Sequence, residues 1–408
     1  MKCSMNFQFI SPLINFQFIS MLEVLILKPE AFGLDISDLS LKITKLKPRS
    51  RRFPSLRGEK IKNGFDLASF GETKIRPGII KGGEVKDEKA LAEIVKGALT
   101  KVKGEKLKTK YVIASLPEEK AFLQVIQMPR MPKEDLKSAV VYEAENYIPL
   151  PIEEVYLDSQ VVLPVHNHLD HSDVLIAALP KKTVDPYLSV FKLAGLKPLV
   201  LEIESLAIAR ALIENQTTTA PVLLIDLGAT RTSFIVFSGN ALRFTSSIPV
   251  SAQGFTEVIA KSLKVSLEKA EKLKIKHGLE EKIKIEIKSE KSERVVERGE
   301  IFEALVPPLV DLIQQIKKHL DYYQTHAVHE HLPPNGREVE KILLCGGGAN
   351  LKGLPELLTL ELKIPVELGN PWINILPESL RERKELPFEE SLSYTTALGL
   401  ALRGIKQC

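Results

Sequence analysis

The sequence is poor in cysteine, in aromatic residues and in net charge, and each shortage excludes a class of protein. Its three cysteines, Cys3, Cys345 and Cys408, lie far apart. Neither a disulfide framework nor a clustered zinc site is therefore expected, and the chain suits a reducing cytoplasm. Aromatic residues make up 6% and form no stripe with basic ones, which argues against nucleic-acid binding. A net charge of +4 over 408 residues favours no particular partner.

Long apolar runs are also missing near the N-terminus. A charge-free segment carries NFQFIS twice, at Asn6–Ser11 and Asn15–Ser20, with Pro12 between the copies. Polar residues interrupt it too often for a membrane-spanning helix, and it lacks the apolar core and cleavage site of a signal peptide. We expect residues 1–30 to be a disordered extension, with Met21 as the functional start. Weak association with a membrane or partner is the alternative.

A basic run is present from Lys42 to Lys62, with nine Lys and Arg against one acid, Glu59. A solvated hairpin or loop is the simpler interpretation of such a run. The alternative is a surface that faces anionic lipid or an acidic partner.

The chain is too long for one ordinary core and suits two or more domains. Strands are predicted within Ala31–Phe70, an amphipathic helix over Glu88–Thr100, and a buried strand over Lys110–Pro117. Strands that alternate with a helix indicate an α/β layer. Residues 118–198 differ, because a helix over Asp135–Tyr147 lies among three predicted strands, and this pattern indicates a small α+β insertion.

The second half begins with an apolar hairpin over Pro221–Gly239. A Lys- and Glu-rich helical region follows to about Gly299. A long helix is predicted over Glu300–Thr325, and Pro307-Pro308 should kink or break it. KILLCGGGANLKGLPELL then predicts a strand, a glycine-rich turn and a helix.

Three turns that follow apolar strands could carry chemistry. They are Gly33-Leu-Asp35-Ile-Ser37 with Lys42 beyond it, Asp226-Leu-Gly228-Ala-Thr230-Arg231, and Cys345-Gly346-Gly347-Gly348-Ala-Asn350. Small residues let backbone N–H groups approach phosphate oxygens. Asp35 and Asp226 could hold Mg²⁺ through water, because Mg²⁺ dehydrates reluctantly. Each turn alone is more often only a turn, but their order along the chain favours a shared nucleotide site.

Histidine-rich stretches are the competing candidates for a metal site. They are His166, His168 and His171 with Asp170 and Asp173, and His326, His329 and His331. Both stretches are polar and are predicted to be loops that fix no coordination geometry. Surface histidines are therefore the simpler interpretation.

In their order, the three turns resemble the phosphate-1, phosphate-2 and adenosine loops of the actin-like ATPase superfamily. Within it, the chain resembles the PilM family of type IV pilus assembly proteins, related to the cell-division protein FtsA. The more specific matches are EAENYIPLPIEEVYLD (Glu143–Asp158), PLVLEIESLAIARAL, GFTEVIAKSL, ELGNPW and YTTALGLALRG. The resemblance covers about Ala31 to Ile405.

The resemblance implies an α/β fold of two lobes, with nucleotide between them and an FtsA-like small α+β subdomain inserted in the first lobe. The implied divisions are 31–117 and 199–219 for the first-lobe core, 118–198 for the inserted subdomain, 220–254 and 300–372 for the second-lobe core, 255–299 for its helical subdomain, and 373–408 for a C-terminal return to the first lobe.

The resemblance also implies, motif by motif, which residues bind ATP. They are Asp35, Ser37 and Lys42 at phosphate 1, Asp226, Gly228, Ala229 and Thr230 at phosphate 2, Gly346, Gly347, Gly348 and Asn350 in the adenosine loop, and Glu271 and Lys274 facing the ribose and base. Relatives carry Gly-Gly where Ser251 and Ala252 stand, and these Cβ atoms could narrow the approach to the phosphates. No Glu or Gln that orients water is evident. ATP binding is therefore expected, with hydrolysis slow or absent.

By the same resemblance, the chain would be a cytoplasmic scaffold of type IV pilus or related secretion machinery. It would capture the N-terminal peptide of a PilN-like inner-membrane protein, near the helix Asp135–Tyr147. That protein would hold it at the membrane and link it indirectly to a PilO-like protein and pilus ATPases, and self-association is open. The alternatives are a small-molecule kinase of the same superfold and an FtsA-like filament-forming protein.

Overall fold

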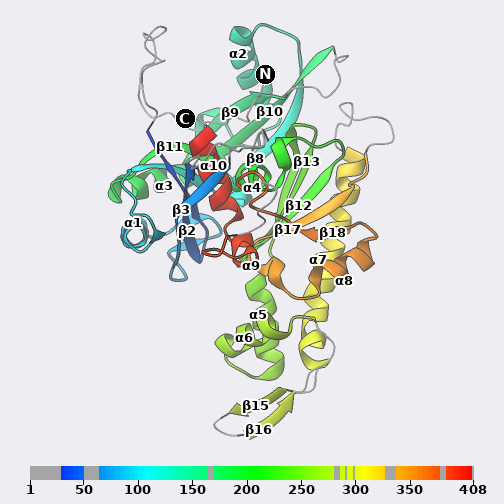
Figure 1. The fold of residues 1–408 in the computed structure, drawn as a ribbon. Coiled ribbons are helices and arrows are strands. Elements are labelled where there is room, and N and C mark those ends of the chain that lie inside the picture. Colours follow the sequence, from blue (N-terminus) through cyan, green and yellow to red (C-terminus); the bar gives the residue numbers. More distant parts are fainter. Residues whose placement is uncertain are drawn as a thin grey trace, which may run out of the picture. The chain divides into compact units, whose positions relative to one another are not determined.

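The structure is a computed structural model, and it describes residues 29–49, 64–162, 170–279, 285–289, 292–296, 299–326, 337–376 and 383–406. The chain divides into two compact units. Unit 1 comprises the described residues up to Thr218, the short segment Gly239–Arg243 and the described residues from Asn370 onward. Unit 2 comprises the described residues within Thr219–Ser238 and Phe244–Gly369. Figure 1 shows the fold, with the helices and many of the strands labelled.

Unit 1 is built on a six-stranded sheet with the strand order β11-β7-β1-β2-β3-β6. Its strands are β1 (Phe32–Ile36), β2 (Ser40–Pro48), β3 (Phe65–Lys74), β6 (Lys103–Gly104), β7 (Tyr111–Leu116) and β11 (Lys197–Ile203). β11, β7 and β1 run parallel, whereas β1, β2 and β3 are antiparallel neighbours. The three parallel strands therefore end at the same edge of the sheet, which is where ligands bind in α/β folds.

Helices of unit 1 pack directly on this sheet. They are α1 (Glu88–Thr100), α3 (Lys181–Leu193), α4 (Glu204–Leu212) and α10 (Thr395–Lys406), and the short helix α9 (Phe388–Leu392) precedes α10. α10 lies against β1 so closely that a Cβ on Gly33 would be 2.5 Å from Ala397 O. It meets α4 as tightly, because a Cβ on Gly399 would be 1.9 Å from Ala207 O. Glycine at these two positions lets the C-terminal helix reach the strand that carries Asp35. The short hairpin β4 (Ile80–Lys81) and β5 (Glu84–Val85) completes this part.

A separate three-stranded sheet, ordered β8-β10-β9, follows β7 in the chain. Its elements are β8 (Phe122–Pro129), α2 (Lys133–Ala144), β9 (Val155–Val161) and β10 (His171–Pro180). α2 covers one face, where Val140 and Ala144 share a buried cluster with Val174 and Ile176 of the central strand. Leu175 alternates with these on β10 and is also buried, so both faces of the sheet are covered. The predicted inserted subdomain spans 118–198, and from here on the name refers to the described residues within Phe122–Pro180.

Unit 2 is organised around a five-stranded sheet with the order β14-β13-β12-β17-β18. Its strands are β12 (Val222–Leu227), β13 (Thr232–Ser238), β14 (Ala241–Ile248), β17 (Lys341–Cys345) and β18 (Val366–Leu368). The helices are α5 (Ala252–Leu263), α6 (Leu267–His277), α7 (Gly299–His326) and α8 (Leu354–Leu362), and β15 (Ile285–Ser289) pairs with β16 (Ser292–Val296).

The predicted break at Pro307-Pro308 does not occur, because α7 runs through both prolines, and the predicted kink stays a prediction. Proline removes its own N–H donor and crowds the preceding turn. Val306 and Pro307 lie on an exposed part of α7, where water can satisfy the carbonyl groups that lose a partner. Burial of Leu305 and Leu309 on the opposite side holds the helix together across this point.

The described part of the basic run is paired with acids. The pairs are Lys42 with Glu72, Lys45 with Glu30, Lys47 with Glu105, and Arg49 with Asp66. This pairing favours the solvated-hairpin interpretation for β2, and residues 50–63 of the run lie outside the described part. Among the described helices, none is both long and apolar enough to cross a membrane. The predicted extension lies almost wholly outside the described residues.

Candidate nucleotide-binding site

Asp35 lies near the carboxyl end of β1 and is only 7% exposed. Its Oδ1 accepts a hydrogen bond from the hydroxyl of Ser115 on β7, at 2.9 Å. The same hydroxyl accepts from the backbone N–H of Ile36 at 3.0 Å. Because β1 and β7 are parallel neighbours, Ser115 fixes the carboxylate at the shared edge of the sheet.

Burial of Asp35 disfavours the charged form of its carboxyl group. Burial raises the pKa of Asp35 above its ordinary value, although the nearby Lys42 ammonium and the Ser115 hydrogen bond act in the other direction. Lys42 faces Asp35 in register across the β1–β2 pair, yet its Nζ donates to Ser40 Oγ at 3.1 Å and pairs with Glu72 at 3.6 Å. A buried carboxylate of this kind would be stabilised in its charged form by a bound cation.

Ser37 closes the turn between β1 and β2. Its backbone N–H and its hydroxyl both donate to the carbonyl oxygen of Ser40, each at 2.9 Å. The hairpin of β1 and β2 in unit 1 therefore holds all three predicted phosphate-1 residues, Asp35, Ser37 and Lys42.

The predicted phosphate-2 turn lies between β12 and β13 in unit 2. The N–H of Gly228 donates to Arg231 O at 2.9 Å and closes the turn. The carbonyl oxygens of Gly228 and Ala229 accept from the N–H groups of Ala252 and Gln253, at 3.0 and 3.1 Å. The first turn of α5 is therefore tied to this hairpin, with Ala229 exposed and Thr230 half-buried at its tip.

The glycine-rich turn after β17 lies directly beside Asp226. Gly346 has φ +82°, and a Cβ there would be 2.2 Å from Asp226 Oδ1. A Cβ on Gly348 would be 2.5 Å from Leu227 Cγ. Any larger residue would therefore collide with β12, so glycine is required for this close approach. Gly347–Asn350 form a short 3₁₀ turn before α8.

Glu271 and Lys274 of α6 contact the beginning of α5. Lys274 Nζ donates to Ala252 O at 2.8 Å and to Thr256 Oγ1 at 2.7 Å, and it pairs with Glu271 at 2.8 Å. Three acceptors match the three donors of an ammonium group. Glu271 and Lys274 thus hold α6 to α5, the helix that supports the phosphate-2 hairpin. Their contact with ribose and base stays a prediction.

Ser251 and Ala252 stand where glycines were expected, and both have a local role. Ser251 is the N-cap of α5, and its hydroxyl accepts from Gly254 N–H at 3.1 Å. Ala252 contributes the N–H that binds Gly228 O. The departure from the family pattern therefore stabilises the start of α5.

Three residues near these loops were not singled out by sequence reasoning for a role at the site. Ser115 positions Asp35 through a hydrogen bond from its hydroxyl. Thr256 accepts from Lys274 and lies against Glu271. Glu118, 4% exposed, accepts from the N–H of Ser205 at 3.2 Å at the start of α4. A small polar residue at the end of a buried strand, as in ASLP, is the signal that could have indicated Ser115.

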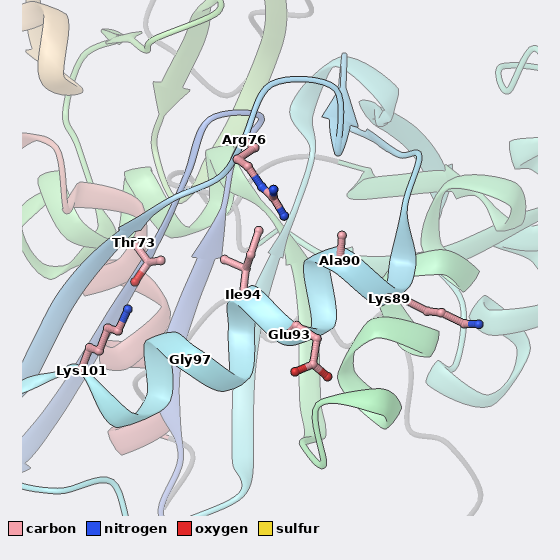
Figure 2. Close-up of a pocket in the computed structure, with 8 residues that line it drawn as sticks. All are labelled: Thr73, Arg76, Lys89, Ala90, Glu93, Ile94, Gly97 and Lys101. Atoms are coloured by element: carbon pink, nitrogen blue, oxygen red, sulfur yellow. The ribbon is translucent and has the colours of Figure 1, made fainter.

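A surface pocket of about 470 Å³ lies elsewhere in unit 1, between β3 and α1. Figure 2 shows Arg76 reaching toward Ala90 and Ile94, while Glu93 and Lys89 point away from them. None of the predicted ATP-binding residues lines it. This pocket is therefore distinct from the nucleotide-binding candidates.

The histidine stretches show no metal site within the described part of the chain, where no group of three or more metal-ligating side chains gathers. His171 lies 3.1 Å from Asp170 and 3.5 Å from Asp173. Four other histidines of the two stretches lie outside the described residues, namely His166, His168, His329 and His331.

Comparison with known proteins gives consistent matches. The family model for the type IV pilus assembly protein PilM matches residues 33–405. Among solved structures, the chain is similar to a PilM-PilN type IV pilus biogenesis complex, with a TM-score of 0.70 and 28% identity over 92% of this chain and 99% of that chain. It is also similar to MreB 5 of Spiroplasma citri bound to AMPPNP, with a TM-score of 0.54 and 14% identity over 92% of this chain and 96% of that chain.

Curated relatives include the cell division protein FtsA of two bacteria. The Pseudomonas aeruginosa protein is 27% identical over 214 residues, which cover 50% of this chain and 47% of that protein. The Escherichia coli K12 protein is 24% identical over 218 residues, covering 50% and 49%. The chain thus spans about half the length of the curated relatives it matches.

Proposed function

Because the chain belongs to the type IV pilus assembly protein PilM family and has the actin-like ATPase fold, we propose that it is an ATP-binding scaffold of a type IV pilus or related secretion machine. It recruits the cytoplasmic N-terminal peptide of a PilN-like inner-membrane protein, which holds it at the membrane and links it indirectly to a PilO-like protein and pilus ATPases. In this proposal the chain has two lobes, and their boundaries are the ones that the resemblance implies.

The meeting of Gly346 with Asp226 carries the ATP-binding part of the proposal. Gly346 has a positive φ and presses against Asp226, so the glycine-rich turn and the carboxylate of the second loop lie together at the ends of the parallel strands β12 and β17, where ligands bind in α/β sheets. MreB 5, a protein of the same fold, is bound to AMPPNP in its solved structure. Mg²⁺ would neutralise phosphate charge when bound, and Asp35 and Asp226 are the carboxylates that would hold it.

We propose that ATP acts chiefly as a structural ligand, with slow hydrolysis or none. Ser251 and Ala252 add side chains where the family pattern has glycine, and the backbone of Ala252 is committed to Gly228. ATP would favour one arrangement of the chain through its higher affinity for that arrangement, and partner binding would be coupled to it.

The partner part of the proposal is supported by the similarity to a solved PilM-PilN complex over 92% of this chain. The inserted subdomain is the proposed receptor for the peptide. Its strands β8 and β9 are the two edges of the sheet, and an extended peptide can pair with an exposed edge.

Nucleotide binding by Asp226→Ala tests the site. We expect Mg²⁺-dependent affinity for a fluorescent ATP analogue to fall at least about tenfold, the equivalent of 1.4 kcal/mol. Asp311→Ala, which removes an exposed carboxylate of α7 in the same unit, is the control and should bind like the wild type. Equal affinities for both variants, with no effect of Mg²⁺, would show that the second loop is wrongly assigned.

Binding of a synthetic PilN-like N-terminal peptide tests the partner. Calorimetry with the full chain and saturating ATP is expected to show a one-to-one complex. A scrambled peptide of the same composition is the control. No detectable binding of the native peptide would contradict the scaffold proposal while leaving ATP binding intact.

A further inference from the structure

The surface pocket between β3 and α1 carries more positive than negative charge. Arg76, Lys89 and Lys101 line it together with one acid, Glu93. Glu93 is paired with Lys96 at 2.7 Å, and Lys96 does not line the pocket. Within the described part of the chain, no carboxylate pairs with any of the three lining cations. The pocket therefore has an unbalanced positive charge that complements an acidic ligand.

The floor of this pocket is apolar and has room for a side chain from outside. Figure 2 shows the guanidinium group of Arg76 directed toward Ala90 and Ile94. Gly97 lies in the interior of α1, and a Cβ there would meet no neighbouring atom within 4 Å. Glycine is less favourable than alanine inside a helix, and no close contact requires it at this position. Its consequence is an open hollow in the pocket.

The edge of β3 beside the pocket has main-chain groups that no described strand pairs. β6 pairs with β3 only as far as Phe70. The carbonyl oxygen of Ala68 faces this edge, because it accepts from the N–H of Glu105 at 2.8 Å. Main-chain groups alternate between the two edges of a strand, so those of Glu72 and Lys74 face the same edge as Ala68. Beyond β6, the described part of the sheet offers them no partner strand.

We propose that this pocket and the adjoining edge of β3 bind an extended acidic peptide segment of a partner protein. The segment adds to Gly71–Lys74 as a further strand, which satisfies the main-chain groups at the edge. Its residue opposite Thr73 has its side chain on the same face of the sheet as the Thr73 side chain, which lines the pocket. Acidic side chains of the segment pair with Arg76 and Lys101, and an apolar one covers the floor.

An extended peptide fits these observations better than a membrane or a free anion does. A lipid headgroup or a phosphate ion can pair with Arg76 and Lys101, but neither supplies the row of main-chain donors and acceptors that an open strand edge binds. The edge of β3 belongs to a different sheet from β8 and β9, the edges proposed for the PilN-like peptide. This inference therefore does not depend on ATP or on that partner.

Fluorescence anisotropy with a labelled synthetic peptide and the full chain tests the site. In this acidic probe, Thr alternates with Glu, Val and Glu, so that the acidic and apolar side chains share one face of the strand. The basic control probe has Lys in place of each Glu. We expect the acidic probe to bind at least about tenfold more tightly than the basic one. A saturating PilN-like peptide should leave this binding unchanged.

Two substitutions test the pocket itself. Arg76→Glu should weaken binding of the acidic probe at least about tenfold. Lys317→Glu makes the same change of charge at an exposed position of α7, and it should bind like the wild type. Gly97→Leu fills the hollow and should weaken binding by a similar factor. Its urea midpoint should equal or exceed that of the wild type, because leucine favours a helix more than glycine does.

Main-chain pairing is tested with two further versions of the acidic probe. One is N-methylated on its Thr residues, and the other is N-methylated on the residues between them. Alternate N–H groups of a strand face opposite edges, so only one of the two sets can donate to β3. One version should therefore bind like the unmodified probe, and the other should lose at least about tenfold in affinity.

An acidic probe that does not bind, or that binds no better than the basic one, would overturn the proposal. So would equal binding by Arg76→Glu and Lys317→Glu, wild-type binding by Gly97→Leu, or equal binding of both N-methylated versions. Displacement by the PilN-like peptide would place both peptides at one site and contradict a separate pocket. Binding of phosphatidylserine vesicles that Arg76→Glu abolishes, with no binding of the probe, would assign the cations to a membrane surface instead.

Discussion

Glu202 of β11 is the centre of a buried ionic cluster in unit 1, and its replacement by Gln should be among the most destabilising single changes. Its carboxylate accepts from Arg210 of α4 at 2.5 and 3.0 Å, and it also accepts from Arg403 of α10. The three side chains are 0%, 3% and 2% exposed. Arg210 also donates to Gly399 O at 3.1 Å, so the cluster joins β11 to both helices.

The magnitude follows from this burial. Glu202→Gln leaves two guanidinium groups without their counter-charge, and breaking a buried ion pair by removing one partner costs about 3–5 kcal/mol. With a urea m-value of about 2 kcal/mol per M, the unfolding midpoint should fall by about 1.5–2.5 M. The exposed pair of Lys47 with Glu105 gives the control, because Glu105→Gln should leave the midpoint unchanged.

Tryptophan fluorescence during urea unfolding is the assay. Trp372 is the only tryptophan of the chain, is fully buried, and lies in unit 1, so its signal reports the unit that contains the cluster. A midpoint for Glu202→Gln within about 0.3 M of the wild type would refute the reasoning, since it would correspond to less than about 1 kcal/mol.

The pH dependence of the cluster has a definite sign. Burial alone would raise the pKa of Glu202, but Arg210 and Arg403 hold it below its ordinary value of 4.5. A group whose pKa is lowered on folding contributes stability that is complete above its unfolded pKa and is lost as pH falls through the folded one. The wild type and Glu202→Gln should therefore converge only in acid below pH 4.5.

Two further changes test unit 2. Gly346→Ala should destabilise it by at least about 2 kcal/mol, because a positive φ is combined with a Cβ that collides with Asp226. Hydrogen exchange of β12 and β17 checks this, with Gly78→Ala, at φ +92° and nothing within 4 Å, as the strain-only control. Burial lowers the pKa of His319 below 6.5, so stability should fall as pH drops below that value. His319→Phe should flatten the decline in thermal melts between pH 7.5 and 5, and equal slopes would contradict this origin.

Local signals in the sequence were reliable where the structure depends on local contacts. The predicted helix Glu88–Thr100 is α1 with the same bounds, because its apolar spacing and the Asp87 cap act within a few residues. The predicted turn that includes Asp35 and Ser37 lies at the end of β1, where the chain turns into β2. The predicted break at Pro307-Pro308 does not occur, because burial along the rest of α7 outweighs the loss of two backbone N–H donors.

The candidate site was predictable as three separate turns, but not as a set of contacts. The pairing of Ser115 with Asp35 spans 80 positions, and no local pattern predicts it. The sequence predicted Ser251 and Ala252 only as obstacles to phosphate, whereas the hydroxyl of Ser251 caps α5, a role that glycine could not fill with a side chain. Lys274 has three partners, of which Ala252 and Thr256 lie on a different helix.

The sequence by itself determined the α/β class, the order of the three glycine- and aspartate-containing turns, and the resemblance that the family match then confirmed. These features depend on side-chain periodicity and on backbone preferences within a few residues. Only the tertiary structure decided that Gly346 meets Asp226, that Glu202 is enclosed by two arginines, and that Lys274 of α6 binds Ala252 and Thr256 of α5. Those outcomes depend on which distant segments pack together and on what that packing removes from water, and neither is encoded in any short stretch of the chain.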